Sequence, residues 1–472
     1  MGKYKTLGQN TLYSFIGAFG TKMIGFLMLP FYTKWLSPSD YGTTDLITVY
    51  ASLLTSAVTL SMHEAIFVFP LNQKFQKQKE YFSTALASSV GSIIITLLVF
   101  FLLSLIGGYL AWKGAFFDNI WSIAFLFSTS YLQTLSQQFC RAIDRMKVFC
   151  LSSLLYAACT AIFALLLIPY FGLFGFIWSV GLSNIVAFLY SAFGVKVYKY
   201  ISVRAVLVSR WMEMAKYAIP LIPNATIWWI ISSLNRPFME KYLGLSAIGI
   251  FAVANKFPTV VSAVLGIFSN SWQISVLQEY GNKTFKEFYS RISLIYIPLL
   301  VLVSCLLALI SEWLIMSFID EKFYEAWKYV PIISLAIVGM GLGGFVGGIF
   351  AAVKKSKYYL YSSIFGGVAT LVFNILLIPY FGLWGAAVSF SLSHFAICLV
   401  RVYYSSRFIK NDKIGIITFY FLMNIILAVL VINKQILLSW VIFTILVALF
   451  CYLNKSVIIE LYTLVSNKNW TR

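Results

Sequence analysis

The octapeptide Leu166-Leu-Ile-Pro-Tyr-Phe-Gly-Leu173 returns letter for letter as Leu376-Leu-Ile-Pro-Tyr-Phe-Gly-Leu383. The same 210-residue offset continues without a gap on both sides, and both copies are strongly hydrophobic. The further matches pair Lys147, Ser152, Ser153, Thr160, Phe163, Gly175, Ser179, Leu182 and Ser183 with Lys357, Ser362, Ser363, Thr370, Phe373, Gly385, Ser389, Leu392 and Ser393. A membrane protein made of two like halves has a cleft between them, and transporters bind substrate in such clefts.

The composition is that of a membrane protein. The 472 residues are 60% hydrophobic and 11% charged, with a mean hydropathy of +0.86. Most apolar runs are long enough to span a bilayer, which takes about 20 helical residues. Helices satisfy their own backbone hydrogen bonds in lipid, whereas a β-barrel would show alternating strands of about 10 residues. Met1–Asn10 leads into the first run without a cleavage site, so we expect that helix to be retained.

The apolar runs predict about 14 transmembrane helices, and the basic residues orient them. The loops on one side, together with both termini, hold 26 of the 35 Lys and Arg residues, and the opposite loops hold seven. Positive loops stay inside, so both termini are predicted to be cytoplasmic. The net charge of +19 is then a topology signal that also attracts anionic membrane lipids. No soluble domain carries a basic face, so no nucleic-acid partner is expected. The predicted spans are 11–33, 44–69, 83–109, 119–139, 150–169, 173–195, 217–235, 246–268, 292–310, 330–352, 360–378, 384–404, 414–432 and 436–453.

The repeat sets the domain organisation. Its offset covers six helices, so an even number separates the copies and the two repeats run parallel, related by an axis along the membrane normal. A weaker echo aligns Leu36, Ser39 and Gly42 with Leu243, Ser246 and Gly249. We therefore predict an N-terminal six-helix lobe (1–210), a C-terminal six-helix lobe (211–410), and two additional helices with a cytoplasmic tail (411–472). The glycine-rich tenth span predicts close helix packing, with a hinge as the alternative.

Three basic residues lie where a membrane protein rarely carries charge. Burying one in the bilayer costs about 2.5–3.5 kcal/mol on insertion scales. Lys22 and Lys256 each lie near the middle of a predicted span, in different halves. Two cations facing one cleft would bind an anion such as a diphosphate, with Arg236 as a further ligand near the exit. Structural ion pairs are the alternative for the lysines, and Arg236 could instead reach water at the interface.

Acidic residues in the second span are candidates for ion coupling. If a proton or Na⁺ drives transport, Glu64 with its neighbour His63, and Asp45 at the other end of the span, are the groups to test. Glu64 could instead pair with a lysine, and Asp45 could cap a helix or face water. No other cofactor and no metal site is expected. His394 is alone on an apolar face, which favours a hydrogen-bonded structural histidine.

Polar and aromatic residues occur where a sugar could use them. Sugars bind through hydrogen bonds and by stacking on aromatic faces. The alternative is that these side chains form an interfacial tryptophan belt or pack helices together. The candidate sugar contacts are Asn10, Asn224, Trp228, Asn255, Trp272 and Gln273.

Four stretches in order carry a family resemblance. They are Leu7-Gly-Gln-Asn-Thr11, Leu36-Ser-Pro-Ser-Asp-Tyr-Gly42, Gly249-Ile-Phe-Ala-Val-Ala-Asn-Lys-Phe-Pro258 with Trp272-Gln273, and the repeated Ile-Pro-Tyr-Phe-Gly-Leu. With the internal repeat and the predicted spans, the chain resembles, from about residue 7 to about residue 455, the polysaccharide biosynthesis (Wzx-type) flippases. These belong to the multidrug/oligosaccharidyl-lipid/polysaccharide exporter superfamily.

The resemblance implies an all-α membrane fold with two MATE-like lobes and no enzymatic activity. It implies a protein of the bacterial cytoplasmic (inner) membrane that moves undecaprenyl-diphosphate-linked oligosaccharide from the inner to the outer leaflet by alternating access. The product would serve O-antigen, capsule or exopolysaccharide synthesis. By position, the diphosphate-binding role falls on Lys22, Lys256 and Arg236. The implied partners are the lipid-linked oligosaccharide, membrane lipids, and a polysaccharide polymerase with its assembly proteins.

Two other functions compete with this interpretation. A drug exporter of the same superfamily would favour acids in its cavity, whereas the two most central charges here are lysines. A membrane polysaccharide polymerase would need a large outward loop with catalytic residues, and the predicted outward loops are short.

Overall fold

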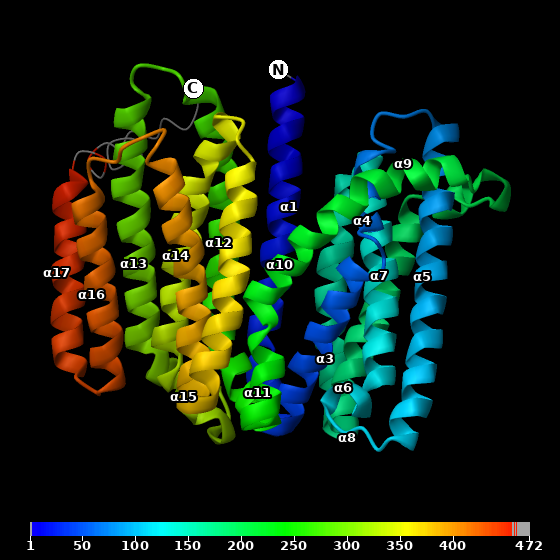
Figure 1. The fold of residues 1–472 in the computed structure, drawn as a ribbon, viewed down its shortest axis with the longest axis horizontal. Helices are drawn as coiled ribbons and strands as arrows, with labels where there is room; N and C mark the ends of the chain where they lie inside the picture. The colour runs from blue at the N-terminus through cyan, green and yellow to red at the C-terminus, as the bar shows by residue number, and fades with distance from the viewer. Residues whose placement is uncertain (1, 456, 458, 460–472) are drawn as a thin grey trace. The chain divides into compact units, whose positions relative to one another are not determined.

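The computed structural model describes residues 2–455, 457 and 459, with side chains described from residue 13 on except at 14 and 267. The chain divides into two compact units, Met1–Val253 and Ala254–Arg472. The described elements are α-helices and short 3₁₀-helices (Figure 1). The predicted all-α class is therefore confirmed.

The first unit contains α1 to α11 and the start of α12. Its elements are α1 (Gly2–Leu27), α2 (Leu29–Trp35), α3 (Pro38–Ala57), α4 (Met62–Val68), α5 (Phe75–Tyr109), α6 (Ala115–Asp118), α7 (Ile120–Ala142), α8 (Met146–Gly194), η1 (Val197–Tyr200), η2 (Val203–Ala205), α9 (Val208–Ala218), η3 (Ile219–Leu221), α10 (Ile222–Ser233) and α11 (Asn235–Leu243). The remaining elements are α12 (Leu245–Glu279), α13 (Phe285–Phe318), η4 (Glu321–Lys328), α14 (Val330–Ala352), α15 (Lys357–Ser405), α16 (Ile414–Ile432) and α17 (Ile436–Leu453).

The helices are long enough for a multi-pass membrane protein. Within the described residues, nine helices are long and apolar enough to cross a bilayer, and the number is eleven if each of two bent pairs counts as one span. One bent pair is α3 with α4, at 56°, and the other is Val208–Ser233 with α11, at 41°. The predicted total of about 14 spans is larger and stays a prediction, as does the cytoplasmic location of both termini.

The repeated octapeptide accounts for part of this difference. Each copy lies inside one 49-residue helical segment, α8 or α15, and reverses the chain there. Gly172 (φ 51°, ψ −124°) and Gly382 (φ 58°, ψ −133°) hold the same backbone conformation, which residues with a side chain rarely adopt. The Ser152 hydroxyl donates to the Ala187 carbonyl at 3.1 Å, so the two arms of α8 lie side by side. Each 49-residue segment thus holds two of the predicted spans.

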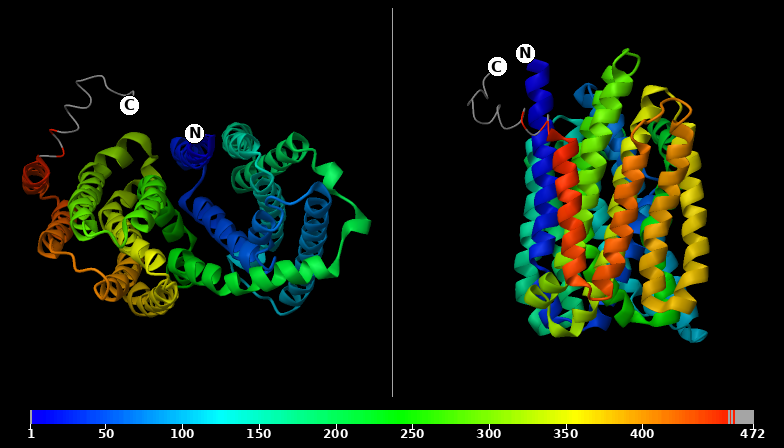
Figure 2. Two further views of the ribbon diagram at one scale, coloured as in Figure 1. Left: turned by 90° about the horizontal axis from the view of Figure 1, so that it is seen from above. Right: turned by 90° about the vertical axis from the view of Figure 1, so that its left-hand side faces the viewer.

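A second difference concerns the predicted cytoplasmic loop around residues 196–216. It contains η1, η2 and most of α9, an amphipathic helix that lies against the ends of α4 and α5 (Figure 2). One face of α9 buries Met214, Ala215 and Ala218. The other carries Arg210, which bonds Glu80 at 3.0 Å. A short amphipathic helix of this kind is suited to the membrane surface rather than to crossing it.

In the second unit, α14 is the most enclosed span, and its glycines explain why. A Cβ at Gly341 would lie 2.3 Å from the Leu300 side chain, and one at Gly347 would lie 2.9 Å from the Tyr359 ring. Small residues let neighbouring helices approach this closely. The predicted close packing of this span is confirmed. On α15, His394 Nδ1 lies 2.8 Å from the Phe390 carbonyl, which confirms a structural histidine.

Candidate functional site

A polar cluster of the first unit begins with Asp45 on α3, whose side chain is partly buried. Ser37 caps the start of this helix: the Asp40 amide donates to the Ser37 hydroxyl at 3.1 Å, and Asp40 closes the reciprocal capping box. Pro38 at the first helical position is preorganised for that start. The cap fixes where α3 begins, and Asp45 follows about two turns later on the face turned to α11.

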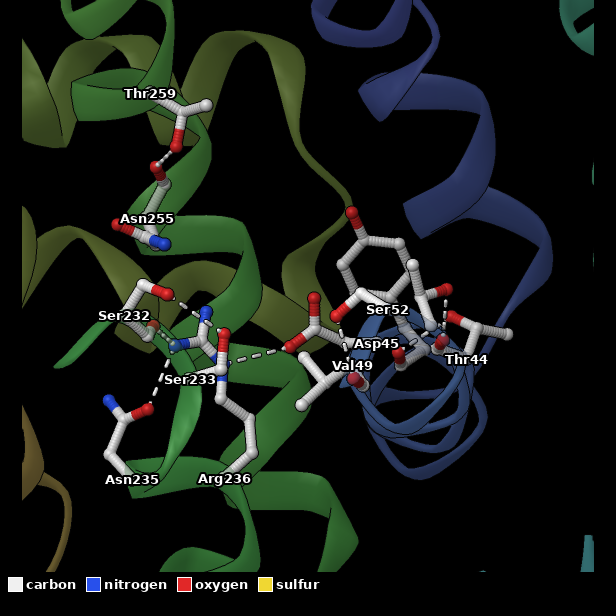
Figure 3. Close-up of polar contacts among 12 residues, drawn as sticks. Thr44, Asp45, Val49, Ser52, Ser232, Ser233, Asn235, Arg236, Asn255 and Thr259 are labelled. Carbon is white, nitrogen blue, oxygen red and sulfur yellow. Dashed lines mark hydrogen bonds and ion pairs between the residues drawn. The ribbon is translucent and has the colours of Figure 1, made fainter. Parts of the chain in front are cut away.

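Arg236 lies at the start of α11, directly after the bend from α10. Its Nε donates to Asp45 Oδ2 at 3.2 Å, and its Nη1 donates to the Ser232 carbonyl and to Asn235 Oδ1, each at 2.8 Å (Figure 3). The guanidinium carbon lies 5.0 Å from the centre of the Phe251 ring. Arg236 is therefore held by one charged group, two neutral acceptors and an aromatic face.

Burial decides how much the ion pair matters. The Arg236 side chain is 6% exposed and that of Asp45 is 23% exposed. Removing one partner of a buried pair leaves an uncompensated charge, which costs about 3–5 kcal/mol when both groups are fully buried. Because the Asp45 side chain is partly exposed, we expect a cost at the lower end of that range. Exposed ion pairs contribute far less.

The cluster contains hydrogen-bond donors that have no acceptor among the described residues. Within the described residues, Asn235 Nδ2 is buried and has no hydrogen-bond partner. Arg236 Nη2 also makes no hydrogen bond there, but it is not among the buried unsatisfied atoms, so it reaches the edge of the cluster. Buried polar groups are normally satisfied. A ligand rich in acceptor oxygens would complement this arrangement.

Backbone contacts bring α3 and its partners close together around the pair. A Cβ at Gly42 would lie 2.0 Å from the Leu245 carbonyl oxygen, and one at Gly249 would lie 2.0 Å from the Pro38 carbonyl oxygen. The Trp229 indole donates to the Val49 carbonyl at 3.0 Å. The start of α12 therefore packs closely against α3, and α10 is hydrogen-bonded to it.

Glu240 on α11 makes a second set of hydrogen bonds between α11 and its neighbours. Its carboxylate accepts from the Tyr50 hydroxyl at 3.2 Å and from the Ala115 backbone amide at 2.6 Å, so it joins α3, α6 and α11.

Glu240→Leu is expected to lower the free energy of unfolding by about 1–3 kcal/mol, because two partly buried donors lose their acceptor. Thermal unfolding of the purified protein measures this. Glu325→Leu is the control, because that side chain is 63% exposed and bonds only Lys328 among the described residues. Equal melting temperatures for the two variants would show that the Glu240 contacts do not stabilise the unit.

The predicted central cations lie on different units. Lys22 is exposed on α1 of the first unit, and Lys256 is half-buried on α12 in the second. Their joint role in one cleft stays a prediction.

The predicted coupling acids do not form one group. Asp45 pairs with Arg236, whereas Glu64 and His63 lie together on α4, with Oε1 and Nε2 3.6 Å apart. His63 Nδ1 is buried and has no hydrogen-bond partner within the described residues. Just before them, Leu60 and Ser61 have positive φ angles of 52° and 51°, where the helix breaks. The coupling role of these groups stays a prediction.

The predicted sugar contacts are dispersed. Asn224 and Trp228 are exposed on α10, Gln273 is exposed on α12, and the side chain of Asn10 lies outside those the structure describes. Asn255 is half-buried and its carbonyl accepts from Thr259 at 2.7 Å. Trp272 is 3% exposed, and it donates to the Phe345 carbonyl at 2.8 Å and stacks on the Phe345 ring. Its indole belongs to the core of the second unit in this structure.

Residues 7–272, more than half of the chain, match the polysaccharide biosynthesis protein family. The chain belongs to this family. Residues 220–376 of this polysaccharide biosynthesis protein also match the MatE family. Together these matches confirm the resemblance to Wzx-type flippases of the multidrug/oligosaccharidyl-lipid/polysaccharide exporter superfamily. No curated protein sequence matches the chain significantly.

Solved structures share the fold of this polysaccharide biosynthesis protein at low sequence identity. Lipid II flippase MurJ, in an inward closed conformation, is 14% identical with a TM-score of 0.70, and the match covers 95% of this chain and 99% of MurJ. An inward-facing multidrug resistance MATE family transporter is 14% identical with a TM-score of 0.63, covering 87% and 95%. A transporter of the same superfamily from Pyrococcus furiosus is 14% identical with a TM-score of 0.55, covering 85% and 95%. The polysaccharide biosynthesis protein therefore has the fold of a multi-pass membrane transporter.

Proposed function

We propose that this protein is a flippase that moves undecaprenyl-diphosphate-linked oligosaccharide from the inner to the outer leaflet of the bacterial cytoplasmic membrane. The match of residues 7–272 to the polysaccharide biosynthesis protein family carries the proposal. The fold supports it, because MurJ, a lipid II flippase, shares it over 95% of this chain. Surface polysaccharide synthesis, of O-antigen, capsule or exopolysaccharide, would use the product.

Three cations would serve the diphosphate in this proposal. Arg236 supplies a planar guanidinium, which matches the geometry of phosphate oxygens. Lys22 and Lys256 would supply point charges from α1 and α12. In this proposal the basic loops would keep both termini in the cytoplasm, and Glu64 with His63 would carry the coupling to H⁺ or Na⁺. A polymerase and its assembly proteins would receive the cargo.

Deleting the gene is expected to trap the lipid-linked oligosaccharide on the cytoplasmic leaflet and to abolish the surface polymer. Leaflet-specific labelling followed by mass spectrometry of the lipid fraction measures both results, and a plasmid copy of the gene is the control. If single repeat units reach the outer leaflet in the deletion strain but are not polymerised, the protein acts as a polymerase instead.

The second candidate function is drug export, which the MatE match to residues 220–376 favours. It predicts that the deletion leaves lipid-linked sugars unchanged and increases sensitivity to cationic drugs. The same strain, tested for minimal inhibitory concentrations beside the leaflet assay, separates the two functions.

A further inference from the structure

The Asp45–Arg236 pair joins the two sequence repeats within one compact unit. Asp45 belongs to the first repeat (1–210) and Arg236 to the second (211–410), yet both lie in Met1–Val253. Around them, Gly42 and Gly249 allow backbone contact and Trp229 bonds the Val49 carbonyl. Transport by alternating access requires helices of the two repeats to separate at some stage. A separation that runs between α3 and α11 would break this contact.

The pair occupies the edge of Arg236 that phosphate would use. A guanidinium binds carboxylate and phosphate through the same planar set of donors. Here Asp45 Oδ2 takes the Nε–H at 3.2 Å, while Nη2 remains at the edge of the cluster without a hydrogen bond to the described residues (Figure 3). Asp45 thus stands where a phosphate oxygen would bind, and an incoming anion has one donor of the same guanidinium available to begin with.

Separation of α3 from α11 in the absence of an anion is unfavourable, because Asp45 supplies the only negative charge that the described residues place on Arg236. The Arg236 side chain is 6% exposed, and its other acceptors, the Ser232 carbonyl and Asn235 Oδ1, are neutral. If Asp45 moved away and no anion took its place, Arg236 would remain buried without a counter-charge. A diphosphate would replace that charge, and the unsatisfied Asn235 Nδ2 could donate to it after a side-chain rotation.

We propose that Asp45 and the diphosphate of the substrate compete for Arg236, so that diphosphate binding releases α3 from α11. This rests on the proposed flippase function and adds the regulation of the same site. Asp45 then acts as an internal substitute for the substrate, which keeps the contact closed until cargo is present. Its role is to position Arg236 and hold α3, not to carry a coupling ion.

The test uses the full-length protein in lipid nanodiscs with inorganic pyrophosphate as the probe. Calorimetry measures pyrophosphate affinity, and hydrogen–deuterium exchange of segments 38–57 and 222–243 measures separation of α3 from α10 and α11. We expect Asp45→Asn to bind pyrophosphate at least about tenfold more tightly and to exchange faster in both segments without ligand, because close charge pairs at interfaces couple this strongly. In the unaltered protein, pyrophosphate should raise exchange in the same segments.

Matched variants make the test specific. Asp118→Asn removes an exposed acid on α6 of the same unit and changes net charge equally, so it should leave affinity and exchange unchanged. Arg236→Gln should weaken pyrophosphate binding at least about tenfold, with Lys22 and Lys256 still present. Where that variant does not fold, Arg236→Lys replaces it and should bind more weakly, because Lys lacks the planar fork.

Three results would overturn the competition. The first is an Asp45→Asn variant with unaltered affinity and exchange. The second is an Arg236→Lys variant that binds pyrophosphate as tightly as the unaltered protein. The third is absence of pyrophosphate binding in both the unaltered protein and Asp45→Asn. The leaflet assay tests the proposed flippase function independently of the competition for Arg236. If the deletion strain traps lipid-linked oligosaccharide and any of these three results is obtained, the flippase function is supported and the competition is rejected. If the lipid-linked sugars are unchanged in the deletion strain, the proposed flippase function itself is rejected.

Discussion

Gly249→Ala is expected to lower the free energy of unfolding by more than about 3 kcal/mol, the upper end of what overpacking usually costs. A Cβ at this position would lie 2.0 Å from the Pro38 carbonyl oxygen and 3.1 Å from the Gly42 amide nitrogen. Both are backbone atoms of α3, so no side-chain rotation relieves the clash and the helices must move apart. That movement also lengthens the Asp45–Arg236 ion pair.

Thermal unfolding and the yield of monodisperse protein measure this effect. Gly91→Ala is the control, because a Cβ on this α5 glycine has nothing within 4 Å. That variant should gain about 0.5–1 kcal/mol from the better helix propensity of alanine. Gly42→Ala should resemble Gly249→Ala, and the double variant should cost less than the sum because both act at one contact. Equal behaviour of Gly249→Ala and Gly91→Ala would mean that α3 and α12 do not pack as described.

The second large effect is expected at the repeated turn. Gly172→Ala and Gly382→Ala should each destabilise the protein by about 1–3 kcal/mol, because both glycines hold a conformation essentially closed to residues with a Cβ. The two costs should be similar, since the octapeptides are identical. They should also add, since the two turns lie in different units.

Denaturant unfolding of the two single variants and the double variant tests this. Gly415→Ala is the control, because its φ is not positive and nothing lies within 4 Å of its Cβ. Loss of stability in one variant only would show that the identical octapeptides do not form equivalent turns.

Much of the fold could be predicted from local sequence signals. Long apolar runs located the helices, and the glycines of α14 indicated close packing, because both features act over a few neighbouring residues. The sequence analysis does not predict the amphipathic helix α9, because the basic residues of this segment indicate only a cytoplasmic loop. Its signal was present, however: Trp211, Met214, Ala215 and Ala218 follow helical spacing before any deep apolar run begins.

The site was less accessible to prediction. The sequence marks Asp45 and Arg236 each as unusual, but it predicts separate roles for them, one in coupling and one in binding the diphosphate. They are 191 positions apart, and the internal repeat, which aligns positions at other offsets, does not pair them. Asn235 and Glu240 gave no local signal, because a polar residue at a helix start ordinarily faces water. For Trp272 the sequence leaves both a sugar contact and helix packing open, and the structure shows the packing: its indole satisfies its own N–H within a core.

The 191-residue separation of Asp45 and Arg236 also has a consequence for synthesis on the ribosome. At about 5–20 residues per second, α3 is inserted roughly 10–40 s before α11 is made. During that interval the Asp45 carboxylate has no guanidinium to meet, and the backbone of α3 at Gly42 is uncovered. A nascent chain that stalls in this interval exposes to the bilayer a helix with an unpaired carboxylate and an uncovered glycine. Membrane proteases and insertases that recognise polar groups in lipid would distinguish that helix from the finished protein.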